Sequence, residues 1–278
     1  MKKPPRFLIA VALCCAGSAC LLAGGCAHRL VDDIAFPAPA LSSNYPETLA
    51  VPLSGGDTGR LFVARHPEAP WDVLYFHGNG EDLGWTLPLL SEMQRVAGVN
   101  LFAADYRGYG ASTGSASVET FEADALSFYD AAVQNGARPD RLIAFGYSIG
   151  GAAAVEVAAK RPLAGLFLNS TFTSLLGVPR IGKLMPFDYL RSQRKMSQIH
   201  CPVLIAHGTN DTLIDPIHAK RLHKAANPPK RLVWLEGENH NSAPGRAPQA
   251  LREMLLWLLQ LGEETKKPRE EPGAKESF

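Results

Sequence analysis

The sequence of 278 residues lacks the signatures of several large protein classes. It has no G-x-G-x-x-G fingerprint, no Walker-type phosphate loop and no paired Cys/His spacing typical of a metal site. No internal repeat indicates a solenoid. The 28 basic and 27 acidic residues give a formal net charge of +1, and no basic run suggests a nucleic-acid partner. We therefore expect no cofactor, no metal and no nucleic acid.

Cysteine is scarce after the first 26 residues, where only Cys201 remains. Three basic residues near the start precede an apolar run from Phe7 to Leu22, a pattern typical of an export signal. The run ends L-L-A-G-G-C, which resembles the lipobox of bacterial lipoproteins, whose cysteine is lipidated and becomes the mature N-terminus. We expect residues 1–25 to be a signal peptide and Cys26 to be the lipidation site.

This assignment implies an exported protein held by a lipid anchor at a membrane, on the outer membrane or the periplasmic face. The lipobox is imperfect, because Ala23 stands three positions before the cysteine and Leu22 lies one further back. The uncharged run from Phe7 to Ala27 is also long enough to be an uncleaved membrane anchor, which remains the alternative.

The rest of the chain divides into three parts. Residues 26–46 contain Pro and Ser without periodicity and are expected to be a tether. Residues 47–262 alternate short apolar runs with helical patterns, which predicts an α/β fold with a mostly parallel, doubly wound sheet and helices on both faces. Residues 263–278, rich in Lys, Glu and Pro, are expected to be a disordered tail.

The most informative stretch reads R-L-I-A-F-G-Y-S-I-G-G-A-A-A-V-E-V-A-A, from Arg141 to Ala159. Its first part is an apolar run of strand length and its last part is an Ala-rich helical run. Between them lies G-Y-S-I-G, and a serine in such a strand-to-helix turn is typical of an exposed nucleophile. We expect a strained backbone at Ser148 and room only for hydrogen at Gly146 and Gly150.

A serine hydroxyl needs a positioned base, and the base needs an orienting carboxylate. His240, in E-G-E-N-H-N-S, lies between the last predicted strand and the last helix, where its ring can reach Ser148. We predict that it is the base. His77 and His207 stand at strand ends and are expected to support loops, whereas the other histidines, His218 among them, are expected at the surface or at segment ends.

Two carboxylates compete for the orienting role in H-G-T-N-D-T-L-I-D-P. Asp215 precedes Pro216 and is explained as a helix N-cap. Asp211 follows an apolar strand directly and shows no comparable local role, so we favour Asp211. Asp105, which ends an earlier strand, is the outside alternative. For the oxyanion hole we predict the backbone N–H groups of Ile149 and Asn79, the latter in the glycine-rich H-G-N-G-E-D.

Together these motifs, with D-Y-R-G-Y-G-x-S-x-G and G-x-x-H-N, resemble the α/β-hydrolase superfamily over about Glu47 to Leu261. The chain looks like the small serine hydrolases that include protein depalmitoylases, which lack a large lid; here the insert from Thr171 to Ile199 is also short. The resemblance implies the α/β-hydrolase fold and an esterase, lipase or thioesterase activity on a small-molecule or lipid acyl substrate.

Two other classes of function stay open at this point. A serine peptidase on the same fold is one, because an acyl-transfer triad does not by itself choose an ester over an amide. The other is a lipoprotein that kept the fold and binds a lipid or a partner without catalysis, although all the catalytic side chains are present in the sequence.

Overall fold

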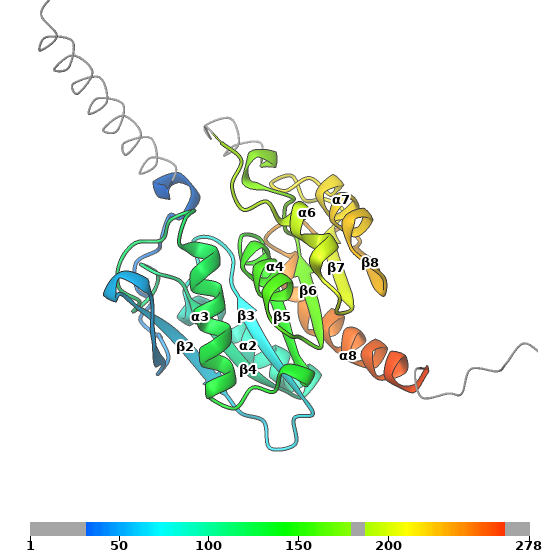
Figure 1. Ribbon diagram of the computed structural model, residues 1–278, viewed down its shortest axis with the longest axis horizontal. Helices are drawn as coiled ribbons and strands as arrows, with labels where there is room; N and C mark the ends of the chain where they lie inside the picture. The colour runs from blue at the N-terminus through cyan, green and yellow to red at the C-terminus, as the bar shows by residue number, and fades with distance from the viewer. Residues whose placement is uncertain (1–31, 179–186, 265–278) are drawn as a thin grey trace, which may run out of the picture.

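The computed structural model describes residues 32–178 and 187–264 (Figure 1). It contains an eight-stranded sheet in the order β1-β2-β4-β3-β5-β6-β7-β8. β1 and β2 form an antiparallel hairpin, β2 pairs antiparallel with β4, and every later pair is parallel. The strands are β1 Leu49–Pro52, β2 Thr58–Ala64, β3 Trp71–Phe76, β4 Val99–Asp105, β5 Leu142–Tyr147, β6 Gly165–Asn169, β7 Val203–Gly208 and β8 Lys230–Leu235.

Helices cover both faces of this sheet (Figure 1). One face carries α3, α4, α6 and α7, and the other carries α2 and α8. The predicted doubly wound arrangement is therefore confirmed. The helices are α2 Leu83–Ala97, α3 Phe121–Gln134, α4 Gly150–Lys160, α6 Ser192–Lys195, α7 Ile217–Ala225 and α8 Ala247–Glu264. None of the helices in the described ranges is long and apolar enough to cross a membrane.

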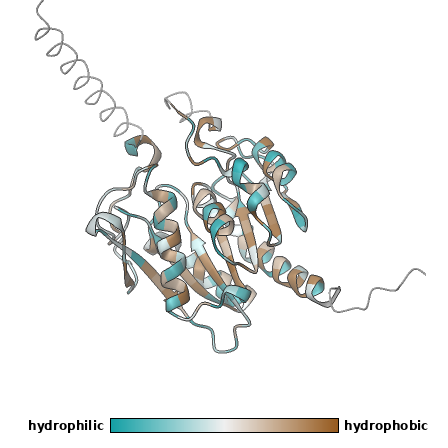
Figure 2. Cartoon of the chain, in the orientation of Figure 1, coloured by the Kyte–Doolittle hydropathy of each residue, from teal (hydrophilic) through white to brown (hydrophobic). Residues whose placement is uncertain are grey.

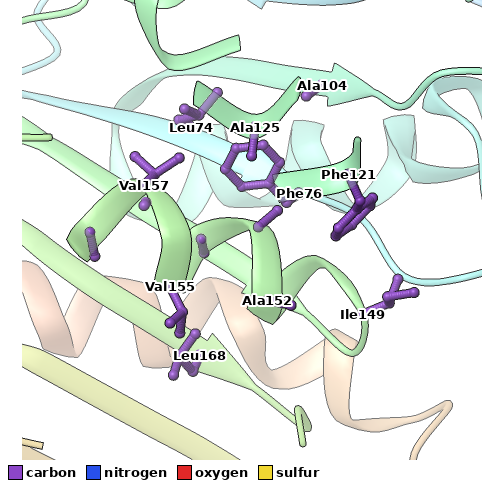
Figure 3. Close-up of a cluster of buried hydrophobic side chains, with 14 of the residues drawn as sticks. Leu74, Phe76, Ala104, Phe121, Ala125, Ile149, Ala152, Val155, Val157 and Leu168 are labelled. Atoms are coloured by element: carbon purple, nitrogen blue, oxygen red, sulfur yellow. The ribbon is translucent and has the colours of Figure 1, made fainter. Parts of the chain in front are cut away.

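The core follows from the two-residue period of the strands. Along β5, Leu142 and Ala144 join the cluster under α3 and α4, whereas Ile143 and Phe145 join the cluster under α2 and α8. Strands buried on both faces read as continuous apolar runs, and Figure 2 shows the central strands as mostly hydrophobic. Figure 3 shows the first cluster, in which side chains of β3, α3, α4 and β6 meet.

The sequence predicts one helix around Thr86 to Ala97, closed by Gly98, and another from Ser117, as its N-cap, to Asn135. The starts of these helices were predicted less well than their ends. α2 ends as expected at Gly98, which takes a left-handed φ of 63°. It begins at Leu83, three residues earlier than expected, because the Asp82 side chain accepts a hydrogen bond from the Trp85 N–H. α3 begins at Phe121, not at the predicted Ser117. The Ser117 hydroxyl instead accepts from the Thr120 N–H and holds a turn before the helix.

The segment expected to be a tether packs on the domain from Asp32 onward. Ala35 and Phe36 are buried, and the Phe36 ring lies 5.1 Å from that of Phe121 between centroids. This N-terminal strap, residues 32–46, is therefore part of the domain. Asp32 and Ala35 accept hydrogen bonds from Val118 and Asn79, whereas Ser42, Asn44 and Tyr45 donate to Asp82, Gly84 and Asp105. At the other end α8 continues to Glu264. The predicted signal peptide, Cys26 and the tail from residue 265 lie outside the described residues.

Candidate active site

Ser148 occupies the tight turn between β5 and α4. Its φ is +53°, a left-handed conformation that costs a non-glycine residue about 1–3 kcal/mol. The turn is fixed from both sides, because the Ser148 N–H donates to the Asn169 carbonyl over 3.0 Å and the Thr171 hydroxyl donates to the Ser148 carbonyl over 2.6 Å. The side chain that results is only 8% exposed, and it stands at the carboxyl edge of the sheet.

The glycines of the turn have the steric role predicted for them. A Cβ on Gly146 would overlap the backbone of Gly150 and Gly151, and a Cβ on Gly150 would overlap the carbonyl groups of Phe76 and His77. The overlap at Gly150 shows that the end of β3 and the loop that follows it lie directly against the N-terminus of α4.

His240 lies in the loop after β8 and meets Ser148 across 92 residues of sequence. Its Nε2 is 3.0 Å from the Ser148 Oγ, and its Nδ1 is 2.7 Å from the Asp211 Oδ2. The Tyr147 hydroxyl donates to the His240 carbonyl over 2.9 Å, which ties the loop to the strand that carries the serine. The structure thus places the three sequence-predicted side chains in one line of hydrogen bonds.

Asp211 is held by more contacts than the sequence suggested. The expectation that it has no local role is wrong, because its Oδ1 accepts from the N–H groups of Leu213 and Ile214. Burial raises the pKa of the Asp211 carboxyl, but hydrogen bonds from His207, His240 and the Ile214 N–H outweigh burial and hold that pKa well below its ordinary value. Asp211 is therefore an ionised acceptor that fixes the His240 ring.

This arrangement fixes the tautomer that acid–base work requires. A carboxylate can only accept, so His240 donates its Nδ1–H to Asp211. The Nε2 is then left with a lone pair directed at the Ser148 hydroxyl. The His240 Nε2 can therefore take a proton from Ser148 while the Asp211 carboxylate stabilises the imidazolium that forms.

Asn79 and Ile149 lie on the two sides of the close approach between the β3 loop and α4. The Asn79 side chain is clamped, since its Nδ2 donates to the Ala35 carbonyl over 2.7 Å and its Oδ1 accepts from the Tyr109 hydroxyl over 2.6 Å. Among residues 32–178 and 187–264, neither backbone N–H has a hydrogen-bond acceptor. The clamp on Asn79 by the strap is a feature that sequence reasoning missed.

Asp105, the outside alternative for the acid, faces a different histidine. Its Oδ1 is 3.0 Å from the His77 Nε2, and the His77 Nδ1 is 2.8 Å from the Gly78 carbonyl. Both ring nitrogens thus meet acceptors. Burial lowers the pKa of His77, but the hydrogen bond and charge of Asp105 outweigh it and leave that pKa raised. His77 supports the loop that carries Asn79, as predicted for a histidine at a strand end.

His218 is expected at the surface or at a segment end, and it lies in the first turn of α7 but is buried. It is 2% exposed, its Nδ1 accepts from the Thr173 N–H, and its Nε2 donates to the Gly177 carbonyl. Burial lowers the pKa of this ring, which keeps it neutral. A signal was available, because His218, Ala219 and Leu222 share the inward face of α7 at helical spacing.

Two sequence comparisons relate this geometry to known proteins. The family described as "Serine aminopeptidase, S33" matches residues 67–186. The human protein called alpha/beta hydrolase domain-containing protein 17B is 36% identical over 184 residues, which cover 65% of this chain and 64% of the relative. A Xenopus tropicalis relative, protein 17C of that series, is 34% identical over 190 residues, or 67% of this chain and 61% of its own length. The alignments thus span a little under two thirds of these relatives.

Solved structures share the fold at low sequence identity. The esterase Est1E from Butyrivibrio proteoclasticus, solved with ferulic acid, has a TM-score of 0.63 at 18% identity and covers 76% of this chain and 99% of its own. An esterase from Pyrococcus furiosus has a TM-score of 0.66 at 14% identity, with 81% and 96% covered. A puromycin-hydrolyzing peptidase from Mycobacterium tuberculosis has a TM-score of 0.62 at 19% identity, with 79% and 40% covered. These likenesses establish the α/β-hydrolase fold.

The two aspartates should respond differently to loss of charge. Asp211→Asn should cut kcat by about 10³- to 10⁴-fold, because an amide in place of Oδ2 favours the wrong His240 tautomer. Asp215→Asn should be nearly silent, because the Asp215 Oδ1 only accepts from the Ile217 N–H and Asn caps helices about as well. Steady-state kinetics on an ester, with circular dichroism as the folding control, measures both. The reverse pattern would mean that the acid is assigned wrongly.

Proposed function

We propose that this chain, which has the α/β-hydrolase fold and holds Ser148, His240 and Asp211 in one line of hydrogen bonds, is a serine hydrolase of carboxylic esters or thioesters. The observation that supports this most is the pair of distances on the two sides of the His240 ring, 3.0 Å to Ser148 and 2.7 Å to Asp211. The short connection between β6 and β7 agrees with the small, short-lidded branch of esterases and depalmitoylases.

The proposed reaction has two steps. His240 Nε2 takes the proton of the Ser148 hydroxyl as its oxygen attacks the acyl carbon, and the imidazolium then gives that proton to the departing alcohol or thiol. Water, deprotonated by the same nitrogen, then attacks the acyl carbon, the bond to the Ser148 oxygen breaks as the imidazolium returns the proton to that oxygen, and the acid is released. No step in this sequence calls for a cofactor.

Stabilisation of the anionic intermediate falls to the backbone. Ile149 is the first residue after the nucleophile and caps α4, whose N-terminus carries a partial positive charge. Asn79 N–H supplies the second donor from the loop after β3. Loss of one such donor typically costs about 10²- to 10³-fold in kcat, so the clamp on the Asn79 side chain has a direct bearing on rate.

A serine peptidase is the second candidate, and two observations favour it. The matching family is described as a serine aminopeptidase, and one structure with the same fold is that of a puromycin-hydrolyzing peptidase. The triad serves amide and ester cleavage alike. Parallel assays of p-nitrophenyl esters, acyl thioesters and aminoacyl anilides separate the two, and preference for the anilides would replace the esterase assignment.

The nucleophile is tested by covalent labelling. A fluorophosphonate probe should label the wild-type protein, and Ser148→Ala should abolish both labelling and turnover, a loss of about 10⁴-fold or more. Ser170→Ala is a matched control, because Ser170 also has a positive φ of 49° and is buried but does not contact His240. Labelling that persists in the Ser148→Ala protein would contradict the assignment of Ser148 as the nucleophile. A wild-type protein that shows no labelling at all would instead be one that only binds lipids.

We also propose that Cys26 is lipidated and anchors an exported enzyme to a membrane. Two or more acyl chains hold a protein firmly, whereas a single chain holds it weakly. Cys26→Ser should therefore move the protein out of the membrane fraction or leave it uncleaved, with the rate on a soluble ester unchanged. Mass spectrometry of the N-terminal peptide decides the matter, since an unmodified Cys26 in a chain that starts at Met1 would indicate an uncleaved anchor.

A further inference from the structure

We propose that the carboxyl edge of the sheet is a membrane-docking face that rests on the surface of a phospholipid bilayer and receives acyl chains from it. The claim about acyl chains rests on the proposed hydrolase function, and the choice of a bilayer as the occupant rests on the proposed anchor at Cys26. The face is formed by an apolar rim, which we define as the exposed side chains of Leu41, Trp85, Leu176, Phe187, Leu213 and Ile217.

The rim accounts for most of the large apolar side chains that the described residues expose. Nine such side chains are exposed there, and six of them belong to the rim. Trp85 is 69% exposed, Phe187 65%, Leu41 56% and Leu176 50%. The other three are Leu49 in the edge strand β1 and Leu256 and Leu259 on α8. Large apolar side chains gathered on one face of a protein mark an interaction site more often than scattered ones do.

Topology brings the rim to the edge where Ser148 lies. Trp85 is in the first turn of the helix after β3, Leu176 and Phe187 follow β6, and Leu213 and Ile217 follow β7. The carboxyl ends of parallel strands share one edge of a sheet, and Ser148, Asp211 and His240 follow β5, β7 and β8 at that same edge. The apolar side chains of the rim therefore belong to segments at the same edge of the sheet as Ser148.

Leu41 joins this edge through the N-terminal strap. The next residue, Ser42, donates its N–H to the Asp82 carboxylate over 2.8 Å, and Asn44 donates to the Gly84 carbonyl over 3.0 Å. These bonds hold Leu41 against the segment that carries Trp85. Tryptophan and leucine on a rigid surface are the side chains that enter the interfacial region of a bilayer most readily.

The length of chain outside the described residues identifies a bilayer as the occupant. The strap begins at Asp32, whose carboxylate accepts from the Val118 N–H in the connection that follows the carboxyl end of β4. Only five residues lie between Cys26 and Asp32, which limits the separation of these two residues to about 20 Å even when the chain is extended. A domain of this size has a radius of gyration of about 17 Å, so an anchor at Cys26 keeps this edge nearest to the membrane. An uncleaved apolar run that ends at Ala27 gives an even shorter connection.

The orientation is tested on the full chain reconstituted into vesicles of phosphatidylethanolamine and phosphatidylglycerol. Lipids brominated on their acyl chains should quench tryptophan emission of the wild-type protein, and Trp85→Phe should remove most of that quenching. Trp71 starts β3 at the opposite edge and serves as the internal reference, so Trp71→Phe should leave the quenching in place. Equal quenching in the wild-type and Trp85→Phe proteins would overturn the proposed orientation.

Turnover tests the function of the face. Leu41→Asp with Trp85→Asp should lower hydrolysis of p-nitrophenyl palmitate dissolved in the vesicles by about tenfold or more, since two apolar side chains leave the bilayer. Hydrolysis of p-nitrophenyl acetate in solution should stay unchanged. The matched control, Leu256→Asp with Leu259→Asp on α8, should change neither rate. Equal loss on both substrates, or equal loss in the α8 control, would overturn the proposal.

The same experiment separates this proposal from the proposed function. If the wild-type protein hydrolyses neither ester, the hydrolase assignment fails, and the quenching measurement still decides whether the rim meets the bilayer. If it hydrolyses both esters and the rim variant matches the wild type on each, the hydrolase assignment stands and the docking face is wrong.

Discussion

The close approach of three backbone segments at the turn from Gly146 to Gly151 is the constraint on which the rest of the site depends. With no Cβ at Gly150, α4 begins against the carbonyls of Phe76 and His77. That contact sets the loop after β3 beside the N-terminus of α4, and Ser148 in the same turn has a positive φ. The Ser148 N–H donates to the Asn169 carbonyl and the Thr171 hydroxyl donates to the Ser148 carbonyl. These two bonds hold the strained turn, so the serine is positioned before any substrate arrives.

Around this turn the polar groups form two separate buried units with different tasks. One unit joins Asp211 to His240 and His207 and holds the base. The other joins Asp105 to His77 and Tyr45 and holds the loop that carries Asn79. Because each buried carboxylate has its own hydrogen-bond donors, neither charge is left unpaired in the interior. The N-terminal strap belongs to the second unit, which connects the segment after the proposed anchor to the active-site loop.

Sequence patterns of a few residues predicted the turns, strand faces and helix ends that depend only on neighbouring residues. The strand-to-helix turn, the two-residue period of β5 and the left-handed end of α2 at Gly98 are all readable within a few residues. Contacts between residues far apart in the sequence were not predicted. The hydrogen bonds between Asn79 and Ala35 and between Ser42 and Asp82 hold residues 32–46 on the domain, although this segment has no periodicity. Ser148, Asp211 and His240 each follow a predicted strand, which predicts their meeting because parallel strands bring their carboxyl ends to one edge of the sheet. His218 was missed because its partners, Thr173 and Gly177, lie more than 40 residues away.

The central claim is that the line from Asp211 through His240 to Ser148 turns the serine into a nucleophile that carries the acyl group. The most direct measurement is mass spectrometry of the intact enzyme, quenched in acid during turnover of a slowly deacylated ester and followed by peptide mapping. The account predicts a mass increase equal to the acyl group, located on Ser148, that forms and decays at rates consistent with kcat. Turnover with no covalent adduct, or with an adduct on another residue, would contradict it.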